Sequence, residues 1–187
     1  MSATRRCMEW LDRIQEIHEA PWKPVSTLAL IVSSAFIAAI SWLANGEHRW
    51  VPILDTANLA FHEAGHPLFG LVSSRLTVYG GTLGQLAFPI VATIAFWLRR
   101  EAVSCAVAVV WLNENLWNIA TYMGDARAQL LPLVGNGEHD WANIFSRWGV
   151  LHLDAAISGF VRLIGWIGTL AAWAWLAWHW HRDREQS

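Results

Sequence analysis

The sequence predicts an all-α polytopic membrane protein, and three observations lead to that fold class. Hydrophobic residues make up 55% of the chain and charged residues only 15%, whereas a soluble domain carries about 25% charged residues. The chain has 14 tryptophans, a residue favoured at the headgroup level of a bilayer. Several apolar stretches also approach the roughly 20 residues that a helix needs to cross a membrane. We expect an integral protein of the bacterial inner (plasma) membrane.

The amino-terminal segment, residues 1–24, is expected to be an amphipathic interfacial segment. Trp10, Leu11, Ile14 and Ile17 recur at helical spacing, with charged residues between them. Such a helix can lie on the membrane surface or pack on its own protein, and the sequence leaves both open. We expect no cleavable signal, because no unbroken apolar core is present in this segment.

The rest of the chain, residues 25–187, is predicted to form one membrane domain. Five segments are candidates for helices, which gives four to five transmembrane helices: residues 25–43, 55–74, 82–98, 102–123 and 159–180. The first begins after Pro24 and carries no charge. The second begins at Asp55 or Thr56, either of which can cap a helix.

A short glycine-rich stretch separates the second and third of these segments. Leu76 to Tyr79 has strand character, and Gly80, Gly81 and Gly84 follow it. We therefore expect a strand-like or re-entrant segment here. A re-entrant segment would also account for the distribution of basic residues. Those near positions 5–23, 99–100 and 182–184 all favour the cytoplasmic side. Simple alternation of full spans does not place all three groups there.

Residues 62–66 form an H-E-x-x-H motif inside the second apolar segment. On a helix, His62 and His66 lie one turn apart on the same face, where both imidazoles can bind one Zn²⁺ ion. Glu63 then lies beside the metal and can take a proton from the attacking water. Ionisable groups within a membrane segment are costly and usually functional. The competing interpretation is hydrogen bonding between helices without a metal.

A catalytic zinc commonly takes a third protein ligand, and the motif supplies only two. Asp125, at the end of the fourth apolar segment, is the leading candidate because its helix can pack against the histidine helix. His139 and Asp140, in a later loop, are the alternatives. Asp140 can instead cap a helix that begins at Trp141.

A polar stripe on the fourth segment leads towards Asp125. Glu114, Asn118, Thr121 and Asp125 recur at helical spacing. Asn115 and Asn118 are candidates for holding a substrate backbone or stabilising an oxyanion. Hydrogen bonding between membrane helices is the alternative, and it is slightly favoured.

These motifs resemble the core of the site-2 protease family of intramembrane zinc metalloproteases. The resemblance covers about residues 55–130 and rests on FHEAGH at 61–66, YGGTLGQLAFP at 79–89 and NIATYMGDA at 118–126. It implies that His62, His66 and Asp125 bind zinc and that Glu63 is the catalytic base. Asp125 is followed here by Ala126, where the family usually has glycine.

The leading functional hypothesis is zinc-dependent hydrolysis of a peptide bond within or beside the bilayer. The expected partners are the lipid bilayer and a membrane-embedded or juxtamembrane peptide, and a homo-oligomer is left open. A net charge of -2 gives no reason to expect nucleic acid. Two alternatives remain: a non-catalytic membrane metal-binding protein (structural, sensor or carrier), and a zinc hydrolase acting on lipid or a small amide.

Overall fold

The structure, a computed structural model, describes residues 19–134 and 138–185, and over these residues it contains helices and no strand. The helices are α2 (Thr27–Asn45), α3 (Leu54–Gly70), α4 (Thr77–Leu98), α5 (Ala102–Gly124), α6 (Asp140–Trp148), the short 3-10 helix η1 (Leu151–Leu153) and α7 (Asp154–Glu185). The predicted all-α class is confirmed. Most of the predicted amphipathic segment, residues 1–18, lies outside the described residues.

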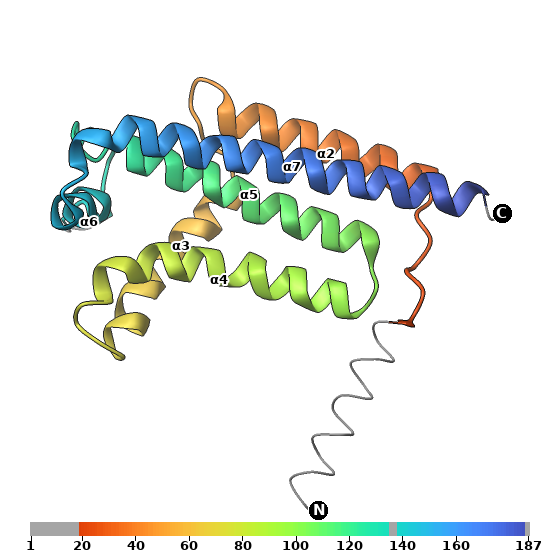
Figure 1. Ribbon diagram of the computed structural model, residues 1–187, viewed down its shortest axis with the longest axis horizontal. Helices are drawn as coiled ribbons and strands as arrows, with labels where there is room; N and C mark the ends of the chain where they lie inside the picture. Colours follow the sequence, from red (N-terminus) through yellow and green to blue (C-terminus); the bar gives the residue numbers. More distant parts are fainter. Residues whose placement is uncertain (1–18, 135–137, 186–187) are drawn as a thin grey trace, which may run out of the picture.

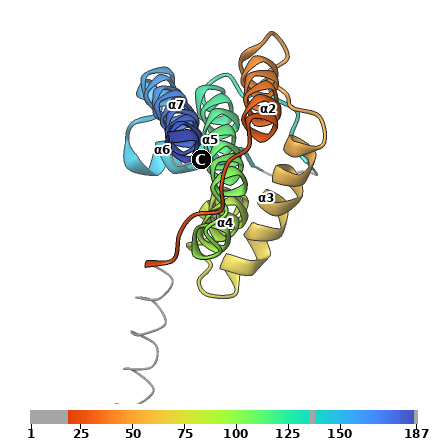
Figure 2. The same ribbon diagram turned by 90° about the vertical axis from the view of Figure 1, so that its right-hand side faces the viewer.

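Helices α2, α4, α5 and α7 run along the long axis of the described part of the molecule, and α3 crosses them (Figure 1). Helix α5 lies among the others, in contact with α2, α4 and α7, as the end-on view shows (Figure 2). Its polar residues Asn113, Glu114 and Asn115 are all buried. Helix α5 therefore directs these polar side chains into the interior of the bundle.

Three of the described helical segments are long and apolar enough to cross a membrane. They are α2, α4 and the stretch from Leu151 to Glu185, with mean hydropathies of 2.0, 1.5 and 1.5. Leucine, isoleucine, valine and phenylalanine side chains on these helices are widely exposed, as expected for a surface that faces lipid. The finer count of four to five spans stays a prediction.

Three basic segments that are distant in the sequence meet at one end of the bundle. The Lys23 backbone N–H donates to the Arg100 carbonyl over 2.8 Å, and the Val25 N–H donates to Asp183 Oδ2 over 2.8 Å. The ring of Trp22 packs against two other tryptophans, Trp97 and Trp175. The beginning of α2, the α4–α5 connection and the end of α7 therefore lie together, because α3 crosses the bundle and adds no full-length pass.

The expected strand at Leu76 to Tyr79 is wrong, since α4 begins at Thr77 and runs through the glycine-rich stretch. The glycines serve helix packing instead. A Cβ atom added to Gly80 would lie 2.5 Å from the Gly65 carbonyl oxygen, and one on Gly84 would overlap the Phe61 carbonyl oxygen. Small residues allow two helix backbones to approach this closely. Helices α3 and α4 thus form the tightly packed pair that carries the H-E-x-x-H motif.

Candidate metal centre

Helix α3 places the two histidines of the motif one turn apart on a common face. His62 is buried and His66 is half-buried, and their ring centroids are 4.9 Å apart. Gly81 of α4 makes room for His62, because a Cβ atom at this position would overlap the imidazole ring. The close approach of α4 therefore fixes where the His62 ring can lie.

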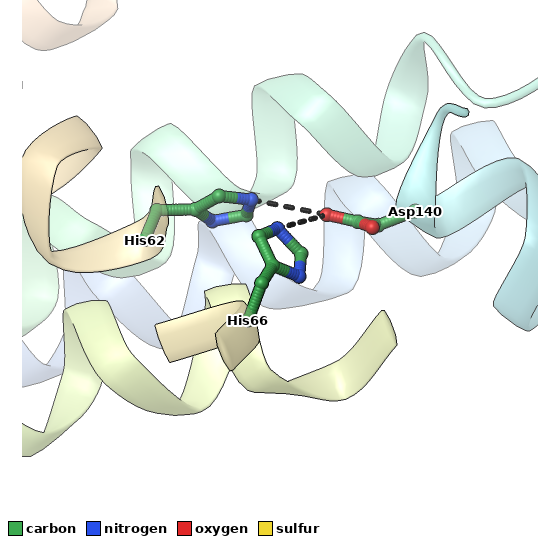
Figure 3. Close-up of side chains that lie close together, drawn as sticks. All are labelled: His62, His66 and Asp140. Atoms are coloured by element: carbon green, nitrogen blue, oxygen red, sulfur yellow. Dashed lines mark hydrogen bonds and ion pairs between the residues drawn. The ribbon is translucent and has the colours of Figure 1, made fainter. Parts of the chain in front are cut away.

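Asp140, the first residue of α6, completes a cluster with these histidines (Figure 3). The Nε2 atoms of His62 and His66 lie 3.0 and 3.3 Å from the same carboxylate oxygen, Asp140 Oδ2. Nitrogen and oxygen ligands of one tetrahedral zinc, each at about 2.0–2.1 Å from the metal, lie about 3.3 Å apart. The three side chains therefore have the chemistry and the spacing of a metal site.

Each imidazole is oriented by a hydrogen bond at its other nitrogen. Nδ1 of His62 lies 2.8 Å from Gln85 Oε1, and Nδ1 of His66 lies 2.8 Å from the Thr77 carbonyl oxygen. Both partners are acceptors, so each Nδ1 can carry the ring proton when Nε2 binds a metal in place of its present contact with Asp140 Oδ2. In that tautomer the Nε2 lone pair of each histidine can bind a metal, and such outer partners raise the basicity of the ligand.

Asn115 and Asn118 accept hydrogen bonds from the side chain of Gln85, which in turn contacts His62. The amide nitrogen of Gln85 donates to Asn115 Oδ1 over 3.1 Å and to Asn118 Oδ1 over 3.4 Å. Neither asparagine is among the described residues that line the cavity at the cluster. Their placement fits the alternative interpretation, hydrogen bonding between helices, better than contact with a substrate.

Asp125, the leading candidate for the third ligand, does not reach the two histidines in this structure. It follows the last residue of α5, and its carboxylate accepts hydrogen bonds from the backbone N–H groups of Leu130 and Leu131 over 2.9 and 3.0 Å. Asp125 Oδ2 also lies 3.4 Å from Nε2 of His139. The carboxylate therefore organises the loop after α5, and Asp140 occupies the position predicted for Asp125.

His139, the other alternative, is buried and also turned away from the histidine pair. Its Nδ1 accepts a hydrogen bond from the Ala142 N–H and so caps α6. Burial lowers the pKa of His139 below its ordinary value. The neutral form is the one that can accept at Nδ1 and present a proton at Nε2 to Asp125. His139 thus helps to set the position of its neighbour, Asp140.

A cavity of about 200 Å³ opens at the cluster. Its described lining consists of the three candidate ligands together with two glutamates, one tyrosine and two apolar side chains: His62, Glu63, His66, Tyr122, Leu133, Val134, Glu138 and Asp140. Glu63 is half-buried and belongs to this lining. A carboxylate that can act as a base therefore faces the same space as the candidate ligands.

Three residues at the site were not predicted from the sequence: Gln85, Thr77 and Tyr122. Gln85 had a visible signal, since an uncharged polar side chain within an apolar membrane helix usually has a specific partner. Thr77 acts through its backbone carbonyl, which no side-chain pattern can indicate. Tyr122 reaches the cluster only because α6 folds back onto the end of α5.

Comparison with known proteins adds no relative to this description. No family model, no curated protein and no solved structure matches the chain.

Proposed function

We propose that this protein is a membrane-embedded zinc hydrolase that cleaves peptide bonds. The observation that carries the proposal is the convergence of two imidazole Nε2 atoms on one oxygen of Asp140, with both Nδ1 atoms held by acceptors. Glu63 lies next to His62 in the sequence and lines the same cavity. Helix α3 thus supplies two metal ligands and the base, and Asp140 of α6 supplies the third ligand.

The donor set fits zinc. Two neutral imidazoles and one carboxylate are a common set for catalytic zinc, which keeps a fourth position for water or substrate. Zinc bound at these residues would polarise a carbonyl group and lower the pKa of water to about 7. His62, His66 and Asp140 would hold the ion, and Gln85 and the Thr77 carbonyl would keep the two rings in place.

Glu63 would move the protons of the reaction. Its carboxylate takes a proton from the water whose oxygen adds to the carbonyl carbon, and it passes that proton to the amine when the C–N bond breaks. Because the proton returns to the leaving group, Glu63 is ionised again at the end of the cycle. The residue therefore acts without binding the metal itself.

The setting supports a substrate that lies within or beside the bilayer. Three of the described helical segments are apolar enough to span a membrane, and α5, which packs among them, is the natural fourth. We place the protein in the bacterial inner membrane. The resemblance of residues 55–130 to site-2 proteases supports the same class of reaction, with Asp140 in place of Asp125 as the third ligand.

Metal content per chain tests the proposal in detergent-purified protein. We expect one zinc per chain in the wild type and in Glu63→Gln, and loss of zinc in His62→Ala and Asp140→Ala. Asp125→Asn is the matched control, because asparagine still accepts from the Leu130 N–H and zinc should be retained. A wild type that holds no zinc after zinc is supplied would refute the proposal, as would an Asp140→Ala variant that keeps its metal.

A non-catalytic metal-binding protein is the second candidate. The size of the cavity favours it, since about 200 Å³ is below the 300–1,000 Å³ that is usual for ligand pockets. Glu63→Gln separates the two candidates. A hydrolase loses cleavage while it keeps zinc, whereas a carrier, sensor or structural site is unaffected by this substitution.

A further inference from the structure

Tyr122 stands in the last turn of α5, beside the candidate metal centre. Its ring centroid is 5.9 Å from that of His62 and 4.2 Å from that of His139. The side chain lines the cavity together with Glu63. Packing against two imidazole rings therefore holds the phenol at the edge of the space where a substrate would bind.

Among the described residues, one hydrogen bond orients the hydroxyl group of Tyr122. Its oxygen accepts a hydrogen bond from the Asp140 backbone N–H over 3.0 Å. A phenol can accept and donate at once. Among residues 19–134 and 138–185, no acceptor takes the hydroxyl proton, so this proton is available to a group in the cavity.

The other polar side chains that line the cavity are candidate metal ligands or carboxylates. With a metal bound, the Nε2 atoms of His62 and His66 are directed at the metal, while their Nδ1 atoms face Gln85 and the Thr77 carbonyl, so neither ring has a donor for the cavity. Glu63, Glu138 and Asp140 are carboxylates, which only accept when they are ionised. Within the described lining, Tyr122 is therefore the side chain that can donate a hydrogen bond.

We propose that Tyr122 is a catalytic residue that donates a hydrogen bond to the substrate carbonyl oxygen as this oxygen becomes an anion. The inference rests on the proposed hydrolysis. When water adds to the carbonyl carbon, the π-electron pair moves to oxygen, and it returns when the C–N bond breaks. The proton stays on Tyr122 throughout, and a preorganised donor of this kind acts on the transition state more than on the bound substrate.

Tyr122→Phe tests this role with a matched control. The substrate is a quenched fluorescent transmembrane peptide rich in Leu and Ala, with a central Gly-Ser pair, and zinc is saturating. Removal of one oxyanion donor costs about 10²–10³ in kcat, and we expect a loss of that size with KM nearly unchanged. Tyr79→Phe changes the second of the 2 tyrosines, which stacks on Trp148, and should leave kcat unaltered.

A second measurement separates catalysis from positioning, since the hydroxyl also holds the Asp140 backbone. If Tyr122→Phe only lowers zinc affinity, and excess zinc restores kcat, the residue positions Asp140 and the catalytic role is refuted. An unchanged kcat refutes it as well. Loss of kcat at full zinc occupancy supports it.

Binding of a tetrahedral anion separates this inference from the proposed function. The probe is N-phosphoryl-leucinamide, measured by calorimetry on the zinc-loaded protein, and it requires no turnover. We expect Tyr122→Phe to weaken its binding at least tenfold and Tyr79→Phe to leave it unchanged. If the wild type cleaves no peptide but shows this difference, the proposed hydrolysis and the catalytic role of Tyr122 are both refuted, and Tyr122 is only a donor to a bound anion. Equal binding by wild type and Tyr122→Phe refutes the donor role even in an active hydrolase.

Discussion

Gln85 Oε1 lies 2.8 Å from Nδ1 of His62, and this contact joins α4 to the candidate metal ligand of α3. The contact is buried, so no water can readily replace it. The amide of Gln85 is itself held by Asn115 and Asn118 of α5. The orientation of one imidazole thus depends on three helices.

Gln85→Leu is expected to weaken zinc binding about 10–100-fold, the usual cost of losing such an outer partner. The leucine leaves the His62 Nδ1–H without an acceptor, so the ring is free to change tautomer or to rotate. Competition with a zinc chelator measures the effect. Gln85→Glu is the control, because a glutamate oxygen still accepts from Nδ1 and should preserve most of the affinity. Equal zinc affinities of Gln85→Leu and wild type would contradict this account.

Gly81→Ala should displace the His62 ring, which a Cβ atom at this position would overlap. Overpacking of this kind costs about 1–3 kcal/mol, and we expect both a lower melting temperature and a loss of zinc. Gly159→Ala is the matched control, since nothing lies within 4 Å of an added Cβ there. Alanine is the better helix former by about 1 kcal/mol, so this control should be neutral or stabilising. The interpretation fails if both variants bind zinc equally.

Glu101 should make stability depend on pH at the basic end of the bundle. A hydrogen bond of 2.6 Å from Lys23 lowers the pKa of the Glu101 carboxyl below its ordinary value of 4.5. Because the pKa is lowered in the folded state, the contribution of ionised Glu101 to the free energy of unfolding is complete above about pH 4.5. This contribution is lost as the pH falls through the folded-state pKa. Melting temperatures of the wild type and Glu101→Gln should therefore differ at pH 7 and converge as the pH falls below the folded-state pKa of Glu101. A difference that persists at the lowest pH at which the protein stays folded would mean that the ionised form is not responsible.

The arrangement of the basic segments predicts that both ends of the described chain face the cytoplasm and that α6 faces the opposite side. The α4–α5 connection, which carries the exposed Arg99, and α6, which carries the exposed Arg147, lie at opposite ends of the bundle (Figure 1). In a background with Cys7→Ser and Cys105→Ser, Arg147→Cys should react with an impermeant thiol reagent in intact cells. Arg99→Cys should react only after the membrane is opened. The reverse pattern would invert the topology, and labelling of both sites in intact cells would contradict it.

The sequence was sufficient for the helical class and for the histidine pair, because both depend on local patterns. A helical repeat is enough to place His62 and His66 on one face. The third member of the cluster depends on how α6 returns to the end of α5, which is a long-range contact. Asp125 follows α5 and Asp140 begins α6, so local patterns suit both, and α6 packs against Ile119 and Met123 with Asp140 at the histidines.

The glycine-rich stretch forms part of helix α4, although its sequence alone indicated a strand. Gly80, Gly81 and Gly84 weaken a helix when each is considered alone. In the bundle they allow close contact with α3, because Gly65 and His62 fill the space that side chains would occupy. The same glycines that indicated a strand therefore make the helix pair possible.

The candidate ligands come from the middle of α3 and from the first residue of α6, two segments far apart in the sequence. An ion shared between them would be a removable cross-link that closes most of the intervening chain into a loop. Since an unfolded chain offers no such preformed set, the free energy of binding adds to that of folding. Each tenfold rise of free zinc above the dissociation constant would add about 1.4 kcal/mol to stability. Zinc supply would then control how long each molecule survives in the membrane, as well as whether it can act.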